Sequence, residues 1–321
     1  MKPQVVVVGS FVQDLTWKCA AFPQPGETVV GTFVTGPGGK GSNQAVAAGR
    51  AGARTLFVGA VGRDVFAADA KKFYRSEGIG ARFVEKPPHA TGTAAILVNA
   101  AGQNEIVVAL GANAALRPAD VPAAALRSAL VVVTQHETDL RTVASVLRTA
   151  RRAGATTIHN PAPMRTDFDP ALLRHVDIVI PNETEFAALV NLLGVAPSEN
   201  FTATELATLS PGEIHTLCRA LNVPTVIITL GSKGVFVSQA GAAGHAVIAA
   251  HKVNVVDTTG AGDAFCGGFA AGLVKFNGDL LAAARFGNAV AALSVTKFGT
   301  APSMPTARAV AAFLRTAGAI A

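Results

Sequence analysis

The sequence predicts an α/β fold, a three-layer α/β/α arrangement in which a mostly parallel sheet lies between helices and carries a small β-sheet lid. Short continuous runs of β-branched residues alternate with helical patterns along most of the 321-residue chain. Such runs are typical of parallel strands that are buried on both faces. Two segments, at about 11–35 and 90–109, break this alternation and are typical of antiparallel pairs. We therefore treat residues 1–321 as a single α/β domain with a lid.

The individual elements follow from the same patterns. The strands are expected at 5–9, 55–59, 130–134, 156–160, 177–182 and 225–231. Helices are expected at 43–51, 64–77, 139–153 and 183–192, and apolar periodicity continues through 280–297 and 306–317. Residues 191–212 are polar and interrupted by Pro and Gly, which indicates a surface insertion. In a parallel sheet of this kind, ligands gather at the carboxyl ends of the strands.

The composition excludes several classes of function. The net charge is +6, but the basic residues are scattered, which favours a pocket for phosphates and argues against a nucleic-acid partner. The three cysteines, Cys19, Cys218 and Cys266, lack C-x-x-C spacing, so we expect neither disulfides nor zinc, and a reducing, cytoplasmic location. No apolar run approaches the roughly 18 residues of a membrane span.

The two lid segments leave the main sheet and return to it. Long excursions from a compact domain tend to be functional, so a lid over the strand ends is favoured over an edge sheet without a role. The segments are also apolar and have open strand edges, from which we expect a homodimer formed through the lid.

The stretch TGPGGKGSNQ at 35–44 has three interpretations. Gly36, Gly38 and Gly41 form a G-x-G-x-x-G, the fingerprint of a dinucleotide-binding dehydrogenase, but that motif should directly follow the first strand, where this chain has SFVQD instead. Gly39 and Lys40 suggest a phosphate loop, but the Ser or Thr that binds magnesium there is missing. The remaining interpretation is a glycine shelf that brings backbone close to a ligand.

The strongest chemical signal is VNVVDTTGAGDAFCGGFAAGLV at 253–274. A strand-like run ends at Asp257, a glycine-rich turn follows, and a helix begins at about Asp263. The N–H groups of Gly260, Ala261 and Gly262 would then form an anion hole at the helix N-terminus. Asp263 has two interpretations: it caps the helix, or it is the carboxylate that accepts a proton from an alcohol during phosphoryl transfer.

Six motifs occur in order from Val5 to about Pro305: GGKGSNQAVAAGRAG, ALGANAAL, NPAP, PNETE, TLGSKG and DTTGAGDAF. In this combination the chain resembles the ribokinase family of carbohydrate kinases. The resemblance implies a ribokinase-like fold, ATP as phosphoryl donor, Mg²⁺ and an activating K⁺. It also implies transfer to the exocyclic hydroxymethyl group of a furanose, with D-ribose the expected acceptor and D-ribose 5-phosphate the product.

The resemblance also assigns residues. Asp263 would be the catalytic base, and the expected sugar-binding residues are Asp14, Gly39, Lys40, Asn43, Glu137 and Asp263. The expected nucleotide and magnesium side comprises Asn182, Glu185, Thr229, Gly231, Ser232, Gly234, Gly262 and Asn288. The expected potassium loops contain Asp257, Thr259, Ser294, Lys297, Gly299 and Ser303.

Several of these residues have an ordinary structural alternative. Asn182 and Glu185 have the spacing of a capping box, Gly231 and Gly234 suit a turn with positive φ, Asp14 suits a turn, and Glu137 suits a helix start. The family also commonly carries an Asn where this chain has Val12, which keeps a nucleoside or another sugar kinase open as an alternative. A non-catalytic sugar or nucleotide sensor is disfavoured because GAGD and N-x-x-E are both intact.

Overall fold

The computed structural model describes residues 2–241 and 244–316, and its centre is a nine-stranded sheet. The strand order is β13-β12-β11-β10-β9-β8-β1-β4-β5. The strands are β1 Val5–Val8, β4 Thr55–Val61, β5 Gly80–Glu85, β8 Val131–Thr134, β9 Thr156–His159, β10 Ile178–Val179, β11 Thr225–Thr229, β12 Val235–Gln239 and β13 His245–Ile248. All neighbours pair in parallel except β11–β12 and β12–β13, so the antiparallel strands lie at one edge.

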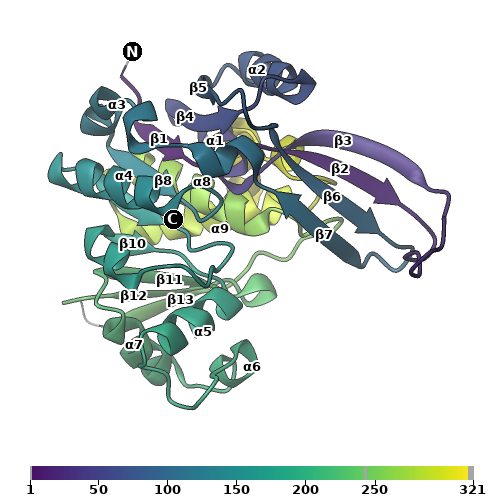
Figure 1. Cartoon of the computed structure of the whole chain (residues 1–321). Coiled ribbons are helices and arrows are strands. Elements are labelled where there is room, and N and C mark those ends of the chain that lie inside the picture. Colours follow the sequence, from purple (N-terminus) through teal and green to yellow (C-terminus); the bar gives the residue numbers. More distant parts are fainter. Residues whose placement is uncertain (1, 242–243, 317–321) are drawn as a thin grey trace.

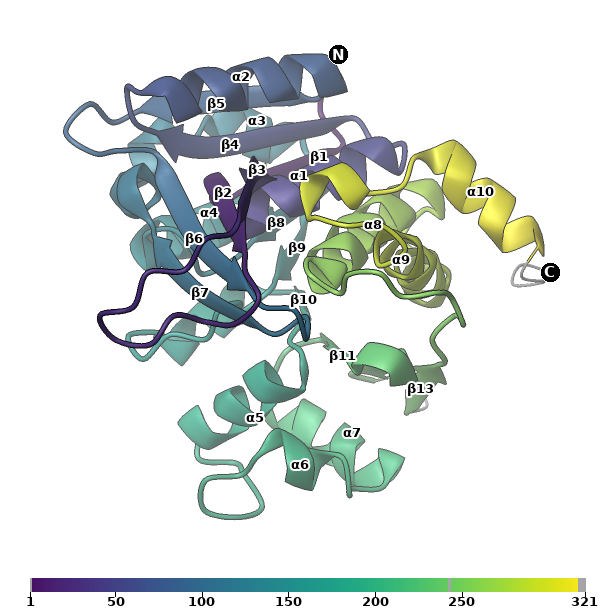
Figure 2. The ribbon, with the colours of Figure 1, turned by 90° about the vertical axis from the view of Figure 1, so that its right-hand side faces the viewer.

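Helices cover both faces of this sheet, as the continuous apolar strands predict (Figure 1). In β1, Val5 and Val7 pack with one helical layer, and Val6 and Val8 pack with the other. The first layer contains α1 Lys40–Arg50, α2 Val65–Glu77, α8 Ala261–Lys275, α9 Leu280–Ser294 and α10 Ala307–Thr316. The second contains α3 Ala123–Ser128, α4 Leu140–Arg152, α5 Glu183–Leu192, α6 Ala203–Leu206 and α7 Pro211–Ala220. Figure 2 shows α8, α9 and α10 together on one side of the strands.

A second, four-stranded sheet projects from the main body, toward the right in Figure 1. Its order is β3-β2-β6-β7, with β2 Val12–Lys18, β3 Thr32–Gly38, β6 Gly92–Val98 and β7 Asn104–Ala109. The two antiparallel pairs predicted from the sequence are present, and β2 and β6 join them through parallel pairing. Strand β2 follows β1 closely and β3 leads directly into α1, so this small sheet lies next to the carboxyl end of β1.

Two glycines let α1 approach its neighbours closely. A Cβ on Gly267 of α8 would overlap the backbone oxygen of Gln44 in α1, and a Cβ on Gly41 would lie 2.6 Å from the Cα of Gly9. Only a residue without a side chain permits such backbone contacts. The glycines therefore bring the N-terminal turns of α1 and α8 together beyond the carboxyl end of β1.

The strand expected to end at Asp257 is wrong, whereas the helix expected after it is present. Residues 251–257 form no strand: Val255 and Val256 are more than 60% exposed, and the N–H groups of Val256 and Asp257 donate to the Val295 carbonyl rather than to a sheet neighbour. The helix expected from about Asp263 is present and begins at Ala261, because Gly260 takes a left-handed conformation with φ 77° and becomes the N-cap.

The insertion at 191–212 is more ordered than a plain surface loop. It contains α6, which begins at a Thr202 capping box, and it is anchored in the core by Phe201 and Leu206. In both views α5, α6 and α7 lie together below the sheet (Figures 1 and 2). None of the helices within 2–241 and 244–316 has the length and apolar character needed to cross a bilayer.

Candidate active site

Asp263 lies in the first turn of α8 and is 7% exposed. Its two carboxylate oxygens are each held by an amide from α1: Gln44 Nε2 donates to Oδ1 at 2.9 Å, and Asn43 Nδ2 donates to Oδ2 at 3.0 Å. The capping interpretation of Asp263 is wrong, because the N-cap is Gly260. A buried carboxylate fixed from two sides has a defined direction in which to accept a proton.

The amide that orients Asp263 belongs to a longer chain of buried amides. Gln135 Nε2 donates to Gln44 Oε1 at 2.6 Å, Gln44 Nε2 also reaches Asn160 Oδ1 at 3.0 Å, and Asn160 Nδ2 donates to the Ile180 carbonyl at 2.8 Å. Sequence reasoning missed these three amides as site residues. Gln44 and Asn160 lie within quoted motifs, and only the fold reveals that they meet.

Glu137 follows β8 and points into the molecule. It accepts hydrogen bonds from Ser10 Oγ at 2.5 Å and from the backbone N–H of Lys40 at 3.0 Å, on one carboxylate oxygen. The interpretation of Glu137 as a helix-start acid is wrong, because Asp139 is the N-cap of α4. Glu137 therefore joins the carboxyl ends of β1 and β8 to the start of α1.

Asp14 is not a turn residue but part of β2 in the small sheet. Burial raises the pKa of its carboxyl to about 7, the hydrogen bond from Thr300 lowers it, and the charges of Glu137 and Asp263 raise it. A Cβ on Gly38 would overlap the Asp14 carboxylate, so the observed position of that carboxylate requires a glycine beside it on β3. Asp14, Glu137 and Asp263 thus form one electrostatically coupled acidic group.

Lys40 is the first residue of α1, after the N-cap Gly39, which has φ 88°. Burial lowers the pKa of Lys40, but the charges of Asp263, Glu137 and Glu185 raise it, and the net shift is upward. The ammonium group therefore stays charged beside these carboxylates. In the stretch 35–44, predicted to be a glycine shelf, Gly39 therefore allows the turn that starts α1 at Lys40.

A cavity of about 170 Å³ lies in front of the α8 N-terminus. Its lining residues are Lys40, Asn160, Ala162, Ile180, Asn182, Glu185, Thr229, Thr258, Gly260, Ala261, Gly262, Asp263 and Cys266. Helix geometry leaves the first N–H groups of α8 without partners inside the helix. The N–H of Ala261 donates to the Thr258 carbonyl at 3.2 Å, so an anion would meet those of Gly262 and Asp263 first.

The capping-box interpretation of Asn182 and Glu185 is confirmed. They form a capping box, in which Glu185 N donates to Asn182 Oδ1 at 2.8 Å and Asn182 N donates to Glu185 Oε2 at 2.9 Å. Both also line the cavity. Burial raises the pKa of Glu185, and Lys40 lowers it. Within 2–241 and 244–316, no group of three or more His, Cys, Asp or Glu residues is arranged to hold a metal.

Of the expected nucleotide residues in and before the turn after β11, only Thr229 is among those that line this cavity. Asn182 and Thr229 form a parallel bridge. Gly231 and Gly234 have positive φ angles of 52° and 96°. A Cβ on Gly234 would also overlap the Ile248 carbonyl oxygen, so the conformation of the turn itself explains both glycines. Ser232 is exposed. Asn288 lies in α9, where its amide donates to the Ala249 carbonyl at 2.7 Å.

The two expected cation loops are joined by one carboxylate. Asp257 Oδ1 accepts from the Thr259 N–H and Asp257 Oδ2 accepts from the Gly299 N–H, both at 2.9 Å. Ser294 ends α9, where its hydroxyl donates to the Ala291 carbonyl. Ser303 is buried, and its hydroxyl donates to the Thr300 carbonyl at 2.8 Å. Lys297 lies between these two loop ends.

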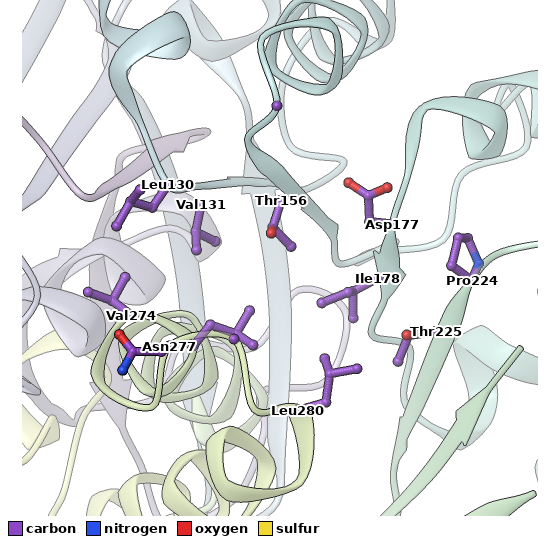
Figure 3. Close-up of a pocket in the computed structure, with 13 residues that line it drawn as sticks. Leu130, Val131, Thr156, Asp177, Ile178, Pro224, Thr225, Val274, Asn277 and Leu280 are labelled. Atoms are coloured by element: carbon purple, nitrogen blue, oxygen red, sulfur yellow. The ribbon is translucent and has the colours of Figure 1, made fainter. Parts of the chain in front are cut away.

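A larger cavity of about 590 Å³ lies at the opposite end of the strands (Figure 3). It is lined by residues such as Val131, Ile178, Thr225 and Leu280, at the start of the strands and beyond the C-terminus of α8. The candidate catalytic carboxylate is not among its lining residues, so size alone does not identify the site.

Together the parallel sheet, the small sheet and the carboxylate at a helix N-terminus define a phosphotransferase that acts on an alcohol. The chain belongs to the PfkB family of carbohydrate kinases, because the sequence model of that family matches residues 2–307. The chain is 36% identical to a ribokinase from Haemophilus influenzae over 98% of this chain and 99% of that one. It is also 36% identical to a deoxyribokinase from Salmonella typhi over 94% and 95% of the two chains.

Solved structures give the same result. A ribokinase from Giardia lamblia has a TM-score of 0.87 and 31% identity, covering 98% of this chain and 99% of that one. The ribokinase from Arabidopsis thaliana, solved with ribose and ATP, has a TM-score of 0.82 and 31% identity over 98% and 99% of the chains. The predicted fold class, including the small sheet, is confirmed.

Proposed function

We propose that the protein is an ATP-dependent kinase that phosphorylates the exocyclic hydroxymethyl group of D-ribose and releases D-ribose 5-phosphate and ADP. The observation that carries this proposal is the Asp263 carboxylate, held by Asn43 and Gln44 at the mouth of a helix N-terminus. The relatives named ribokinase support the choice of sugar. The Arabidopsis ribokinase complex with ribose and ATP supports the pair of ligands.

In the proposed reaction the acceptor hydroxyl gives its proton to Asp263. The hydroxyl oxygen forms a bond to the γ-phosphorus, and the bond from that phosphorus to the bridging β-oxygen breaks. The free N–H groups at the start of α8, first those of Gly262 and Asp263, and the Lys40 ammonium stabilise the negative charge on the transferred group. Asp14, Gly39, Asn43 and Glu137 hold the sugar from the side of the small sheet.

The nucleotide side is proposed to comprise Asn182, Glu185, Thr229, Gly231, Ser232, Gly234 and Asn288. Glu185 fits Mg²⁺ because it is one carboxylate beside a phosphate site, and Mg²⁺ is usually held by one or two carboxylates, waters and substrate phosphates. When bound there, Mg²⁺ would neutralise charge on the phosphates. The resemblance assigns K⁺ to the loops that contain Thr259, Ser294, Lys297, Gly299 and Ser303, and Asp257 holds these loops together by accepting from the Thr259 and Gly299 N–H groups. Backbone carbonyls of such loops would suit a large monovalent cation.

A second candidate acceptor is 2-deoxy-D-ribose. Val12 and Asp14 lie two residues apart in β2, so their side chains share the face directed at the acceptor. Val12 is 2% exposed and apolar, whereas the family commonly offers an amide there. An apolar side chain suits an acceptor that lacks a hydroxyl, and two relatives are named deoxyribokinase. A nucleoside is the remaining alternative from the same class.

A coupled assay of ADP release over D-ribose, 2-deoxy-D-ribose, D-fructose and nucleosides tests the function. We expect turnover with D-ribose, and the ratio of kcat/KM for ribose over deoxyribose to rise in Val12→Asn. Turnover with none of these acceptors would refute the proposal. Turnover with nucleosides alone would replace it with a nucleoside kinase.

We also propose a cytoplasmic homodimer of single-domain subunits. The face of the small sheet opposite Asp14 exposes Trp17, Phe33 and Val107, with Val107 73% exposed. An apolar face of this kind is suited to association with a second copy. Sedimentation measurements of the molar mass of the wild type and of Val107→Lys test this proposal. We expect a dimeric wild type and a monomeric variant, and a monomeric wild type would contradict the proposed homodimer. The ligands are small molecules, with no role for nucleic acid or membranes.

A further inference from the structure

Thr300 occupies a position between the small sheet and the anion hole. It lies at the start of a short 3₁₀ turn, Ala301–Ser303, and is 9% exposed. Its hydroxyl lies 3.3 Å from Asp14 Oδ2 in β2 and 3.2 Å from the Pro37 carbonyl in β3. One side chain from the C-terminal region therefore contacts both strands that lead to the acceptor site.

The other side of Thr300 faces α8. A Cβ on Gly260, the N-cap of α8, would lie 3.5 Å from the Cα, Cβ and Cγ2 atoms of Thr300. The gap between them is therefore about as wide as a methyl group, and the Thr300 side chain lies beside the residue that opens the anion hole. The preceding N–H, that of Gly299, is tied to Asp257, which also holds the Thr259 N–H.

A second contact joins the same two parts of the molecule. The Lys18 ammonium, at the end of β2, lies 3.8 Å from the ring centroid of Phe298, two residues before Thr300. Phe298 and Thr300 both contact the small sheet. A shift of the small sheet relative to residues 298–300 would therefore break or stretch these contacts. Gly299, which lies between Phe298 and Thr300, donates its N–H to Asp257 in the turn at 257–260.

We propose that Thr300 is a positioning residue that couples the placement of the small sheet over the acceptor to the conformation of the anion hole. This proposal deepens the proposed function and rests on it for the identity of the ligands. An acceptor that binds Asp14 competes for the hydrogen bond of Thr300, and any movement of β2 or β3 is transmitted to Gly260. The two binding sites then share a coupling free energy, which by linkage acts equally in both directions.

Two variants separate the hydroxyl of Thr300 from the volume of its side chain. Thr300→Val keeps the volume and removes the hydroxyl, whereas Thr300→Ser keeps the hydroxyl. Thr296→Val is the matched control, because the Thr296 hydroxyl donates only to the Leu293 carbonyl of its own helix end.

The first measurement is amide hydrogen exchange of the whole chain without ligands, so that its outcome is independent of the acceptor. For Thr300→Val we expect about fivefold faster exchange, as the loss of one hydrogen bond allows, both in 12–18 and 32–38 and in 259–263. Thr300→Ser and Thr296→Val should leave both regions as in the wild type. Faster exchange confined to 296–303 would overturn the coupling.

The second measurement is the ratio of ADP dissociation constants without and with saturating D-ribose. We expect this ratio to fall toward one in Thr300→Val, while the ADP affinity without sugar stays within about twofold of the wild type. An unchanged ratio in Thr300→Val would contradict the proposal. If D-ribose does not bind to the wild type, the proposed acceptor fails, and the exchange measurement alone decides the role of Thr300.

Discussion

Gln44 and Asp263, 219 residues apart in the sequence, are joined by a hydrogen bond of 2.9 Å from the Gln44 amide to the Asp263 carboxylate. The bond exists because Gly267 permits α1 and α8 to pack in backbone contact. The geometry of the proposed base therefore depends on how two helices pack and on one amide that fits between them.

Replacing Gln44 by Leu should lower kcat. The change removes a donor from Asp263 Oδ1 and leaves the buried Gln135 amide without its acceptor. We expect a loss of about tenfold or more in kcat, with a smaller change in acceptor KM, because the carboxylate remains but loses its fixed direction. Steady-state kinetics measure this split.

Gln13→Leu is the matched control for Gln44→Leu. The Gln13 amide is also buried, but it donates to Thr35 within the small sheet, on the opposite face of β2 from Asp14. It should leave kcat within about threefold of the wild type. Equal losses of kcat in the two variants would argue against an orienting role for Gln44.

Gly267→Ala should reduce both stability and activity. The new methyl group would overlap the Gln44 backbone oxygen, so α1 must move away from α8 at a cost of about 1–3 kcal/mol in the free energy of unfolding. Gly212→Ala, in the first turn of α7 with open space around it, should be neutral or slightly stabilising. Urea unfolding of the three proteins tests this, and a neutral Gly267→Ala would contradict the close packing.

Asp14 should make the stability depend on pH. Burial raises the pKa of this carboxyl from 3.8 to about 7, so the folded state binds a proton that the unfolded state has released. The resulting destabilisation is absent below about pH 4, grows from pH 4 to 7 and is constant above. Asp14→Asn removes it, so the variant's stability relative to the wild type should rise across this range. A pH-independent difference would show that the pKa of Asp14 is normal in the folded protein.

His136 and His159 should cause loss of stability in acid. Their Nε2 atoms lie 2.9 Å apart, and burial lowers the pKa of His136 to about 4 and that of His159 well below 6.5. Both remain neutral in the folded state while the unfolded chain binds protons below pH 6.5, so stability is lost as the pH falls from 6.5 toward 4. Replacing both by Gln should flatten the urea stability profile over this interval. An equal slope in the variant would assign the acid sensitivity to other groups.

Much of the fold could be predicted because it depends on local patterns. Continuous apolar strands, caps and glycine turns predict α2, α4 and α5 to within one residue of their observed bounds. The strand expected before Asp257 was wrong: Val255 and Val256 give the segment an apolar, β-branched pattern, but they are exposed and their backbone pairs with no strand. Apolar content alone does not reveal which neighbour a segment pairs with.

The candidate site was predicted less completely, for a physical reason. Asp263, Lys40 and Glu185 lie in local motifs whose chemistry is recognisable, and the structure brings them to one cavity or its rim. Gln44, Asn160 and Thr300 form hydrogen bonds with residues more than 100 positions away in the sequence. Their amides and hydroxyl carry no local signal, because only tertiary packing decides what they contact.

The central claim is that Asp263 removes the proton from the acceptor hydroxyl. The most direct measurement compares kcat and the acceptor dissociation constant of the wild type with those of Asp263→Asn, using D-ribose and ATP. Asn keeps the shape and loses the base, so kcat should fall by at least about 10²-fold while D-ribose affinity stays within about threefold. A variant with unchanged kcat would contradict the account.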